Sequence, residues 1–269
     1  MGYTDAANRY THFSYEMVAL TPRCALDLGY PVSEEDQKRP YLEVSGRKGF
    51  GVKADDLLDR LIAAAQAEVS QRHPELPPAD QADIARQIGV GALRFFMLRF
   101  TRNTVIAFDF KDALSFEGET GPYIQYSIVR AANILRKAGI TGPEALAAIA
   151  SAPSIGSSAE NLSPPAAIDP ATMTTLLADP ENTGIWETWL LISRLTAVLD
   201  QSITTAEPAH LARYAFQLAQ QFNNFYHRHH VLNETDPGRR ALLLATAAAS
   251  ERELTRTLAL LGIEAPPVM

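Results

Sequence analysis

The sequence has one cysteine, no long apolar run and no excess of positive charge. Cys24 is the only cysteine in 269 residues, so no disulfide can form within the chain, which fits a reducing compartment. No stretch approaches the roughly 20 apolar residues that a transmembrane helix needs. The N-terminal MGYTDAANRY has neither a basic start nor an apolar core, unlike a signal peptide. We therefore expect a cytoplasmic protein that makes no membrane contact.

The charge balance limits how the chain could bind a polyanion. It carries 24 Lys and Arg against 31 Asp and Glu, a formal net charge of −7. A strongly basic nucleic-acid-binding protein has the opposite balance, so contact with a nucleic acid must come from local basic patches. Hydrophobic residues make up 46% and charged residues 20%, which is ordinary for a globular protein.

The first half mixes short β-prone stretches with helical ones. HFSYEMVAL, RPYLEVSG and NTVIAFDF are typical of strands, whereas PRCALDLGYPVSEEDQKRP reads as a loop. Apolar residues at helical spacing predict a helix from Ala54, and a second candidate around 80–100 is weakened by Gly89 and Gly91. A third helix follows, with Thr120 as a candidate N-cap and Gly139 as a candidate C-cap.

The second half reads as helical after an interruption. Residues 151–184 are rich in serine, proline and alanine, which predicts a loose connection with one short helix around 173–177. Three helical segments follow at 185–203, 208–232 and 238–263. We predict a mainly α fold: a C-terminal helical bundle preceded by a small α/β part, with domains at 1–112 and 113–269.

The stretch VSGRKG, residues 44–49, combines glycines with two adjacent cations. Gly46 and Gly49 let a backbone approach a ligand closely, and Ser45, Arg47 and Lys48 could contact phosphate oxygens. The other reading is a solvated turn, which is the better explanation of six residues taken alone. The P-loop pattern is absent.

An ordered set of motifs surrounds this loop: HFSYEMV, VSGRKGFGVKADDLLDRL, GALRFFMLRFTRNTVIAFDF, ALSFEGETGPYIQYSIVRAANILRKAG, QFNNFYHRHHVL and the ending LLGIEAPPVM. The set resembles the C-terminal part of arginyl-tRNA synthetase, a class I family. There a Met-Ser-Thr/Gly-Arg-Lys-Gly loop replaces the KMSKS signature, and a DALR-type helical domain binds the tRNA anticodon. Val44 stands here in place of the usual Met, and the approach to the loop is longer than usual.

The resemblance implies roles for particular residues. Lys48 and Arg47 would be catalytic cations, and Ser45, Gly46 and Gly49 would join them in binding ATP, with Mg, as arginyl-adenylate forms. In the helical part, Tyr226 and Met269 would contact the anticodon of tRNA(Arg). Tyrosine stacking on an unpaired base contributes about 1–3 kcal/mol. The structural alternatives are a core or rim aromatic for Tyr226 and a frayed terminus for Met269.

Two further patterns favour structural roles. His227 and His230 share a helix face but have no cysteine or carboxylate nearby, so we expect no metal site and prefer a helix-end role. Tyr123 and Tyr126 also share a face, and we favour packing over contact with tRNA. The basic stretch 238–240, together with Arg213 and Arg228, could form a local patch.

The sequence contains neither the HIGH-type motif nor the arginine pocket of a class I synthetase. We therefore expect the chain alone to be catalytically inactive and to need an N-terminal half before it binds arginine and ATP productively. The alternative is a stand-alone, non-catalytic RNA-binding protein derived from a synthetase. A third reading is a helical scaffold without a nucleic-acid role. We expect a monomer.

Overall fold

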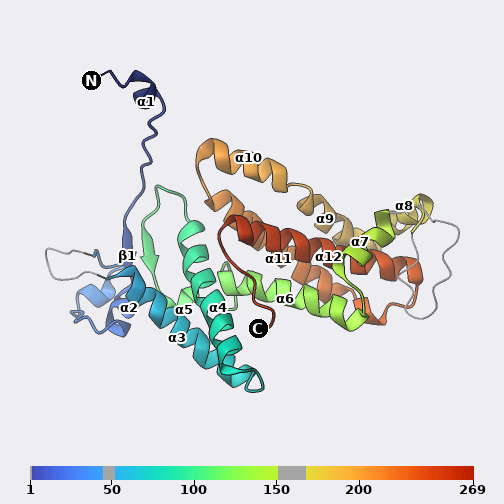
Figure 1. Ribbon diagram of the computed structural model, residues 1–269, viewed down its shortest axis with the longest axis horizontal. Helices are drawn as coiled ribbons and strands as arrows, with labels where there is room; N and C mark the ends of the chain where they lie inside the picture. The colour runs from blue at the N-terminus through green and yellow to red at the C-terminus, as the bar shows by residue number, and fades with distance from the viewer. Residues whose placement is uncertain (1, 45–51, 151–167) are drawn as a thin grey trace. The chain divides into compact units, whose positions relative to one another are not determined.

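The structure, a computed structural model, describes residues 2–44, 52–150 and 168–269 (Figure 1). The chain divides into two compact units. The smaller unit comprises Met1–Val52 and Phe100–Asp109, and the larger, helical unit comprises Lys53–Arg99 and Phe110–Met269. The predicted loop residues Ser45, Gly46, Arg47, Lys48 and Gly49 lie outside the described residues.

The smaller unit is built around a two-stranded parallel sheet. Strand β1 (Val18–Leu20) pairs with β2 (Ile106–Phe108), with Val18 opposite Ile106. Helix α2 (Pro22–Asp27) packs against β1 and against the 3-10 helix η1 (Asp36–Lys38), whereas α1 (Thr4–Asn8) has no buried residue. The only regular pairing of RPYLEVSG among the described residues is an isolated bridge from Leu42 to Leu20, so the expected strand is reduced to one bridge.

Helix α2 corrects the expectation of a loop after residue 21. The Thr21 side chain accepts a hydrogen bond from the Cys24 N–H, and Pro22 occupies the first turn, where a missing N–H costs nothing. Behind this helix Asp109 is 1% exposed and forms an ion pair with Arg23 at 2.5 Å. A threonine cap followed by proline starts a helix here, although the proline suggested a loop.

The helical unit confirms the predicted mainly α fold with a C-terminal bundle. Its longer helices are α3 (Ala54–Arg72), α4 (Pro78–Leu98), α6 (Gly121–Ala138), α9 (Thr183–Ile192), α10 (Leu195–Thr205), α11 (Ala209–Arg228) and α12 (Pro237–Leu260). Shorter ones are α5 (Phe110–Ala113), α7 (Gly142–Ala150), α8 (Pro170–Ala178), η3 (Pro180–Asn182) and η4 (Val231–Asn233).

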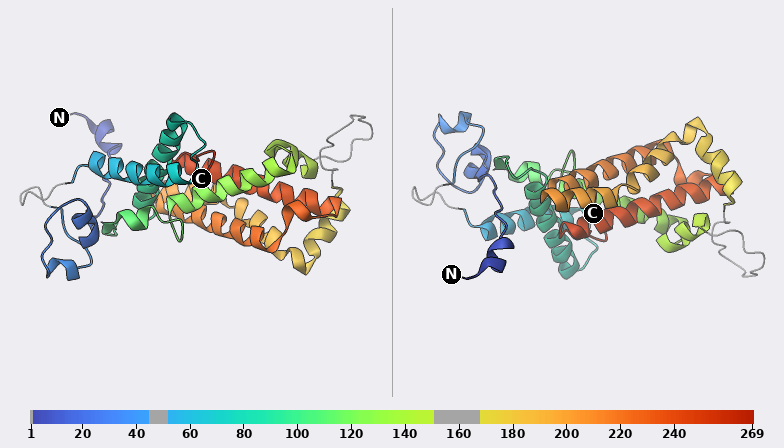
Figure 2. Two further views of the ribbon diagram at one scale, coloured as in Figure 1. Left: turned by 90° about the horizontal axis from the view of Figure 1, so that it is seen from below. Right: turned by 90° about the horizontal axis from the view of Figure 1, so that it is seen from above.

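Helix α12 is the centre of the bundle. It packs against α6, α7, α9 and α11, and Figure 2 shows it running alongside α6 and α11. Leu242, Leu243 and Leu244, three successive residues, are each at most 2% exposed. Residues 241–250 are all buried, and a helical stretch that is buried on every side belongs inside a bundle rather than on its surface. Many of its other buried residues are alanine, which lets the neighbouring helices approach closely.

Helices α3 and α4 belong to the same unit as the C-terminal bundle. Helix α4 packs on both α3 and α6. Compactness therefore divides the chain differently from the predicted boundary between residues 112 and 113, because α3 and α4 lie before that boundary in sequence. Where the functional domain begins stays a prediction.

The helix ends follow the predicted caps at α6 but not everywhere. The Thr120 side chain accepts from the Tyr123 N–H, and Gly139 ends the helix at φ 73°, the left-handed conformation that glycine adopts readily. The segment predicted as one helix over 185–203 is broken at Ser193 and Arg194 into α9 and α10. The expected short helix near residue 175 is α8, whereas residues 151–167 lie outside the described part.

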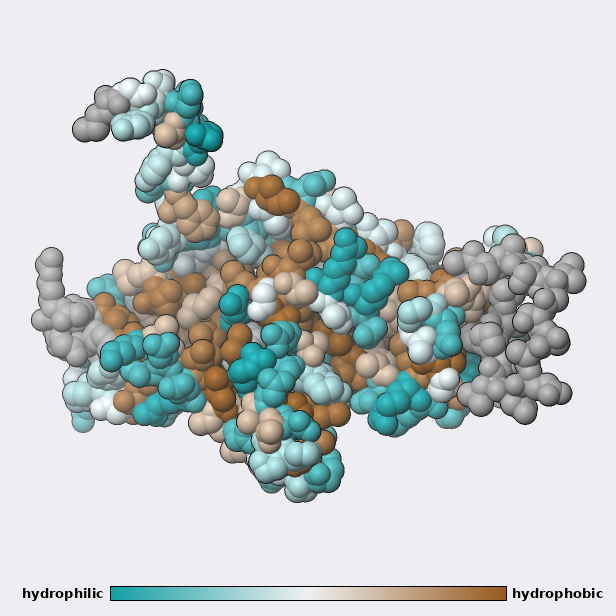
Figure 3. Space-filling model, viewed as in Figure 1, coloured by the Kyte–Doolittle hydropathy of each residue, from teal (hydrophilic) through white to brown (hydrophobic). Residues whose placement is uncertain are grey.

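The surface of the helical unit mixes polar and apolar side chains (Figure 3). An apolar area lies over α10, where Ile203 is 76% exposed. No helix in the described part of the chain is both long and apolar enough to span a bilayer.

Candidate nucleic-acid interface

An open cavity of about 290 Å³ brings together the two residues that the sequence singled out for RNA contact. Tyr226, from the last turn of α11, lines it together with Met269, the last residue. Helix α6 supplies the opposite wall through Tyr126, Arg130, Asn133 and Lys137, and the remaining lining is apolar: Val129, Ile134 and Leu232.

The wall from α6 follows from helical spacing. Tyr126, Arg130, Asn133 and Lys137 lie four, three and four residues apart, so they form one stripe along the helix. The next stripe, which contains Ile124, Ile128 and other buried residues, faces the core. Because that stripe is buried, the polar stripe points away from the core.

Arg130 lies between two tyrosine rings. Its guanidinium carbon is 4.8 Å from the centre of the Tyr126 ring and 5.0 Å from that of Tyr226. A cation over an aromatic face contributes about 0.5–1 kcal/mol at exposed sites. The Arg130 Nη1 also donates to Oδ1 of Asn223 at 2.5 Å. The side chain is therefore held from three directions before any ligand binds.

Asn223, on α11, is the hydrogen-bond acceptor that holds this arginine. It is 7% exposed, and its Nδ2 donates to the Tyr123 hydroxyl at 3.0 Å and to the Ser127 hydroxyl at 2.9 Å. The amide oxygen of Asn223 accepts the hydrogen bond from Arg130, so both the oxygen and the nitrogen of this buried amide have partners, as a buried amide requires. Tyr123 itself packs against Phe216 at 5.6 Å between ring centres, which agrees with the packing role expected for it.

Tyr226 keeps an exposed ring surface although it lies on a packed helix. It is 39% exposed, whereas Phe222 and Phe225 on the same helix are fully buried. Nearby, Lys137 is exposed at the cavity edge. An aromatic face beside two cations can stack an unpaired base and attract its phosphate. The site thus combines the two interactions that single-stranded nucleic acids use.

The C-terminus is anchored at this cavity. Val268 and Met269 pack against the apolar cluster of α3 and α4 that includes Ala65 and Ile84. Shortly before the C-terminus, the Glu264 carbonyl accepts a hydrogen bond of 2.7 Å from Nε2 of the fully buried Gln125. These contacts argue against a frayed terminus, because the last residues pack against the helices.

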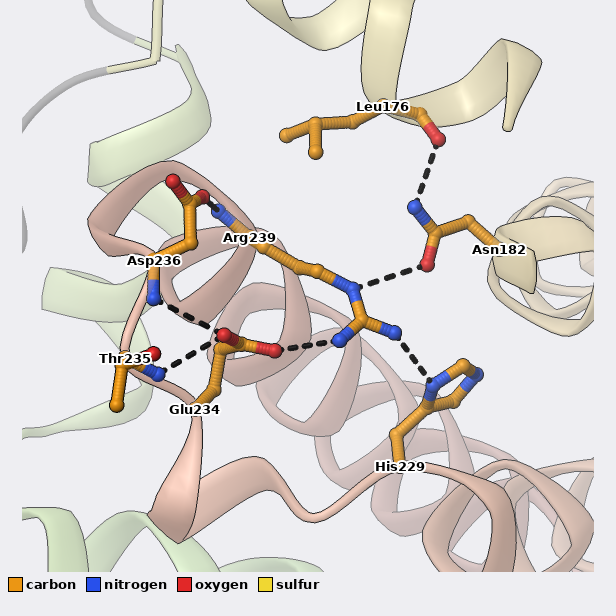
Figure 4. A network of polar contacts seen from close by, with 7 residues as sticks. All are labelled: Leu176, Asn182, His229, Glu234, Thr235, Asp236 and Arg239. Atoms are coloured by element: carbon orange, nitrogen blue, oxygen red, sulfur yellow. Dashed lines mark hydrogen bonds and ion pairs between the residues drawn. The ribbon is translucent and has the colours of Figure 1, made fainter. Parts of the chain in front are cut away.

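A second polar network fixes the turn between α11 and α12 (Figure 4). Arg239 donates from Nη1 to Glu234 at 2.5 Å, from Nε to Asn182 Oδ1 at 3.2 Å, and lies 3.3 Å from Nδ1 of His229. Asn182 in turn donates to the Leu176 carbonyl at 2.9 Å. One arginine therefore links α8, η3, the end of α11 and the start of α12.

The protonation states in this network follow from its donors. A guanidinium only donates, so Nδ1 of His229 accepts and the ring proton lies on Nε2. Burial, then the charge of Arg239, lowers the pKa of His229 below its ordinary 6.5, so the ring is neutral at pH 7. The hydrogen bond from the Asp236 N–H lowers the pKa of Glu234 the most. Burial raises that pKa and Arg239 lowers it further, so the pKa of Glu234 is lowered overall.

This network corrects the expectation of a basic patch at residues 238–240. Arg239 points inward to Glu234 and His229, and Arg240 donates to the Leu232 carbonyl at 2.9 Å. Arg213 lies elsewhere, in a groove beside α10. Among the described residues, no group of three or more histidines, cysteines or carboxylates could hold a metal ion.

Sequence reasoning missed Arg130 and Asn223. Both sit among several similar polar residues on amphipathic helices, and their spacing alone does not distinguish them. The available signal was the pair Tyr126 and Arg130, four residues apart on the predicted third helix.

Comparisons with known proteins agree with the residue pattern. Residues 124–269 match the DALR anticodon binding domain family. The chain is 32% identical over 271 residues to arginine–tRNA ligase of Pyrococcus abyssi, covering 100% of this chain and 36% of that protein. It is also 32% identical to the Lactiplantibacillus plantarum enzyme, covering 99% of this chain and 42% of the relative.

Solved structures give the same result. The arginyl-tRNA synthetase of Thermus thermophilus superposes with a TM-score of 0.70 at 29% identity, covering 100% of this chain and 37% of that one. The Plasmodium falciparum enzyme, at 20% identity and a TM-score of 0.61 over 81% of this chain and 34% of that one, shares the fold. The chain spans between a third and a half of the length of these proteins. It belongs to the DALR anticodon-binding domain family and corresponds to a C-terminal part of arginyl-tRNA synthetase.

Proposed function

We propose that this chain is the tRNA-binding part of an arginine–tRNA ligase and reads the anticodon of tRNA(Arg) in the cavity around Tyr226. The observation that carries the proposal is the position of Arg130 between the rings of Tyr126 and Tyr226. The exposed Tyr226 ring would stack on an unpaired base, and Arg130 and Lys137 would neutralise the adjoining phosphates.

Met269 would close the cavity on its remaining side. Its backbone and side chain belong to an anchored C-terminus, so they can contact a base without first being ordered. Pre-ordered contacts lower the entropy cost of binding. Recognition would thus depend on the packing of the last residues against α3 and α4 as well as on the tyrosine.

The test is the affinity for tRNA(Arg) at several salt concentrations. We expect Tyr226→Ala to weaken binding about tenfold, since one stacked base contributes about 1–3 kcal/mol. Tyr226→Phe keeps the ring and serves as the matched control, so it should bind nearly as well as the wild type. Equal affinity for all three proteins would contradict the assignment. Salt-dependent binding of tRNA would reject the scaffold reading, and no binding of tRNA at any salt concentration would favour it.

The second part of the proposal concerns the loop at residues 45–49. Arg47 and Lys48, with Ser45, Gly46 and Gly49, would contact ATP phosphates while arginyl-adenylate forms, with Mg as counter-ion. The support is the motif and the family, because these residues lie outside the described part of the chain. This chemistry would require the remainder of a synthetase, and the chain alone would be inactive. A cytoplasmic location and a monomeric state remain predictions.

A kinetic measurement tests the loop. In an intact enzyme containing this chain, Lys48→Ala should lower the rate of adenylate formation far more than it weakens arginine binding, because Lys48 would act on charge that develops in the transition state. If both fall equally, Lys48 has another role.

A further inference from the structure

A second hollow, the α10–α11 groove, lies on the other side of α11 from the Tyr226 cavity. Its volume is about 410 Å³. Helix α10 and the residue before it contribute Gln201 and Arg194, and α11 contributes His210, Arg213 and Gln217. Gln217 precedes Tyr226 by nine residues, which is about half a turn out of phase at 100° per residue. The groove is therefore separate from the anticodon cavity.

The rim of the groove is rich in hydrogen-bond donors. Arg194 and Arg213 are both exposed, and in the described part of the chain neither guanidinium has a carboxylate within ion-pair distance. Each guanidinium carries five N–H donors in a planar fork. The amide groups of Gln201 and Gln217 also form no side-chain hydrogen bond with other described residues. None of these side chains is engaged in holding the fold.

The floor of the groove is apolar and fixed. Leu191, Val198 and Tyr214 form it, and Tyr214 is only 2% exposed. The tyrosine hydroxyl donates to the Ile192 carbonyl at 3.3 Å, at the end of α9. Burial, then the charge of Glu253 on α12, raises the pKa of Tyr214, so the phenol stays neutral.

The charge around the groove is one-sided. No Asp or Glu is among the described residues that line it, although the chain as a whole has a net charge of −7. Glu187, on the preceding helix, is turned towards Gln221, 3.3 Å away. In an acidic protein, a groove with two arginines and no carboxylate among its described lining residues is a place where an anion is favoured.

We propose that the α10–α11 groove binds a phosphoryl group, carried either by an RNA backbone or by a free nucleotide. Two arginine forks match the oxygens of phosphate, where they can form paired hydrogen bonds. The amides add neutral donors, and the apolar floor suits the sugar or base beside the phosphate. An acidic peptide also carries anions, but each of its carboxylates has only two oxygens, whereas a phosphoryl group offers three oxygens to the two guanidinium groups.

The side-chain Nε resonances of the arginines provide a site-specific test in the whole chain. Pyrophosphate, titrated at constant ionic strength, should shift the Arg194 and Arg213 resonances saturably. The double substitution Arg194→Gln and Arg213→Gln should weaken binding at the groove at least about tenfold, because both cationic donors of paired hydrogen bonds to phosphate are lost. The shift of a backbone amide in the groove, such as that of Gln217, follows binding in this variant.

Arg256→Gln provides the matched control. Arg256 is an exposed arginine on α12 that does not line the groove, and among the described residues it has no ion-pair partner. Its replacement should change the affinity less than twofold. Shifts that stay linear, or equal effects of the control and the double substitution, would overturn the proposal. So would a glutamate-rich peptide that binds the groove more tightly than pyrophosphate.

A titration with tRNA separates the two sources of phosphate. If the RNA backbone occupies the groove, the double substitution should reduce the salt dependence of tRNA binding by about two phosphate contacts. An unchanged salt dependence, with pyrophosphate binding lost, assigns the groove to a free nucleotide. Tyr226→Ala should leave the pyrophosphate shifts intact, so failure of the groove and failure of the anticodon cavity give different results.

Discussion

Asn223 orients the side chains that line the Tyr226 cavity. It lies beneath Arg130, accepts from that arginine, and donates to Tyr123 and Ser127. A single amide thus connects α11 to three positions on α6. Because the arginine is held by this bond as well as by two rings, it reaches the cavity already oriented.

Replacement of this amide should affect both stability and binding. We expect Asn223→Leu to lower the free energy of unfolding by about 1–3 kcal/mol, because buried polar groups of its partners lose a hydrogen bond. Urea unfolding measures this change. The neighbouring Asn224 is exposed, so Asn224→Leu is the control and should change stability by less than about 0.5 kcal/mol. If the two substitutions lower the free energy of unfolding equally, the hydrogen bonds of Asn223 do not contribute to stability.

His229 should make stability depend on pH in a defined window. Its pKa is lowered by burial in the folded chain, so below its ordinary value of 6.5 the unfolded chain binds more protons. The free energy of unfolding should therefore decrease as pH falls from 6.5 towards 5. The pKa of Glu234 is also lowered, but from an ordinary value of 4.5, so its effect begins at lower pH.

The substitution His229→Asn tests the origin of this slope. Asparagine offers Arg239 an acceptor but does not titrate. Unfolding free energies measured between pH 5 and 6.5 should fall less steeply for the variant than for the wild type. Identical slopes would show that other groups cause the pH dependence.

Residue roles were only partly readable from the sequence. Tyr226 and Met269 were predicted from their motifs, and the structure places both at one cavity, while their contact with RNA stays a prediction. Arg130 was not found, because its role depends on Tyr226 and Asn223, which lie on another helix. Sequence spacing shows which residues share a face of one helix, but it does not show which faces of two helices pack against each other.

At the scale of elements, two glycines explain how α4 and α6 approach. A Cβ built on Gly121 would lie 2.6 Å from the Gly91 carbonyl oxygen, and one on Gly91 would lie 2.6 Å from the Gln125 side chain. Gly91 had counted against a helix at this position. In the folded chain it allows backbone contact, and that contact compensates for its low helix propensity.

A pair of matched substitutions tests this contact. Gly121→Ala should destabilise the chain by about 1–3 kcal/mol, because the backbone of α4 cannot move away as a flexible side chain could. Gly142→Ala is the control: Gly142 also begins a helix before a proline, yet its nearest atom would be 3.8 Å away. Thermal unfolding should separate the two variants, and similar midpoints would contradict the close approach.

Element boundaries were predictable where a capping residue marks them. Thr120 and Gly139 predicted the ends of α6 because their side chain and backbone conformation act locally. The break between α9 and α10 carries no proline or glycine, so the local sequence gives no sign of it. Both α9 and α10 pack against α11, and such packing is not visible in a periodic pattern.

At the scale of the whole molecule, an acidic chain presents local positive sites. The net charge is −7, yet Arg130 and Lys137 line one cavity, and Arg194 and Arg213 line another. The mainly α fold was predictable, since helical periodicity covers most of the chain. The parallel pairing of β1 with β2 was not, because the two strands are far apart in sequence and nothing local specifies their partner.

The central claim is that the Tyr226 cavity reads an anticodon base. The most direct measurement compares the affinity of the chain for tRNA(Arg) with that for the same tRNA carrying a different anticodon. The wild type should prefer the native anticodon by about tenfold or more, which is 1.4 kcal/mol or more, and Tyr226→Ala together with Arg130→Gln should abolish that preference. A wild type that binds both tRNAs equally, or a double variant that still discriminates, would contradict the account.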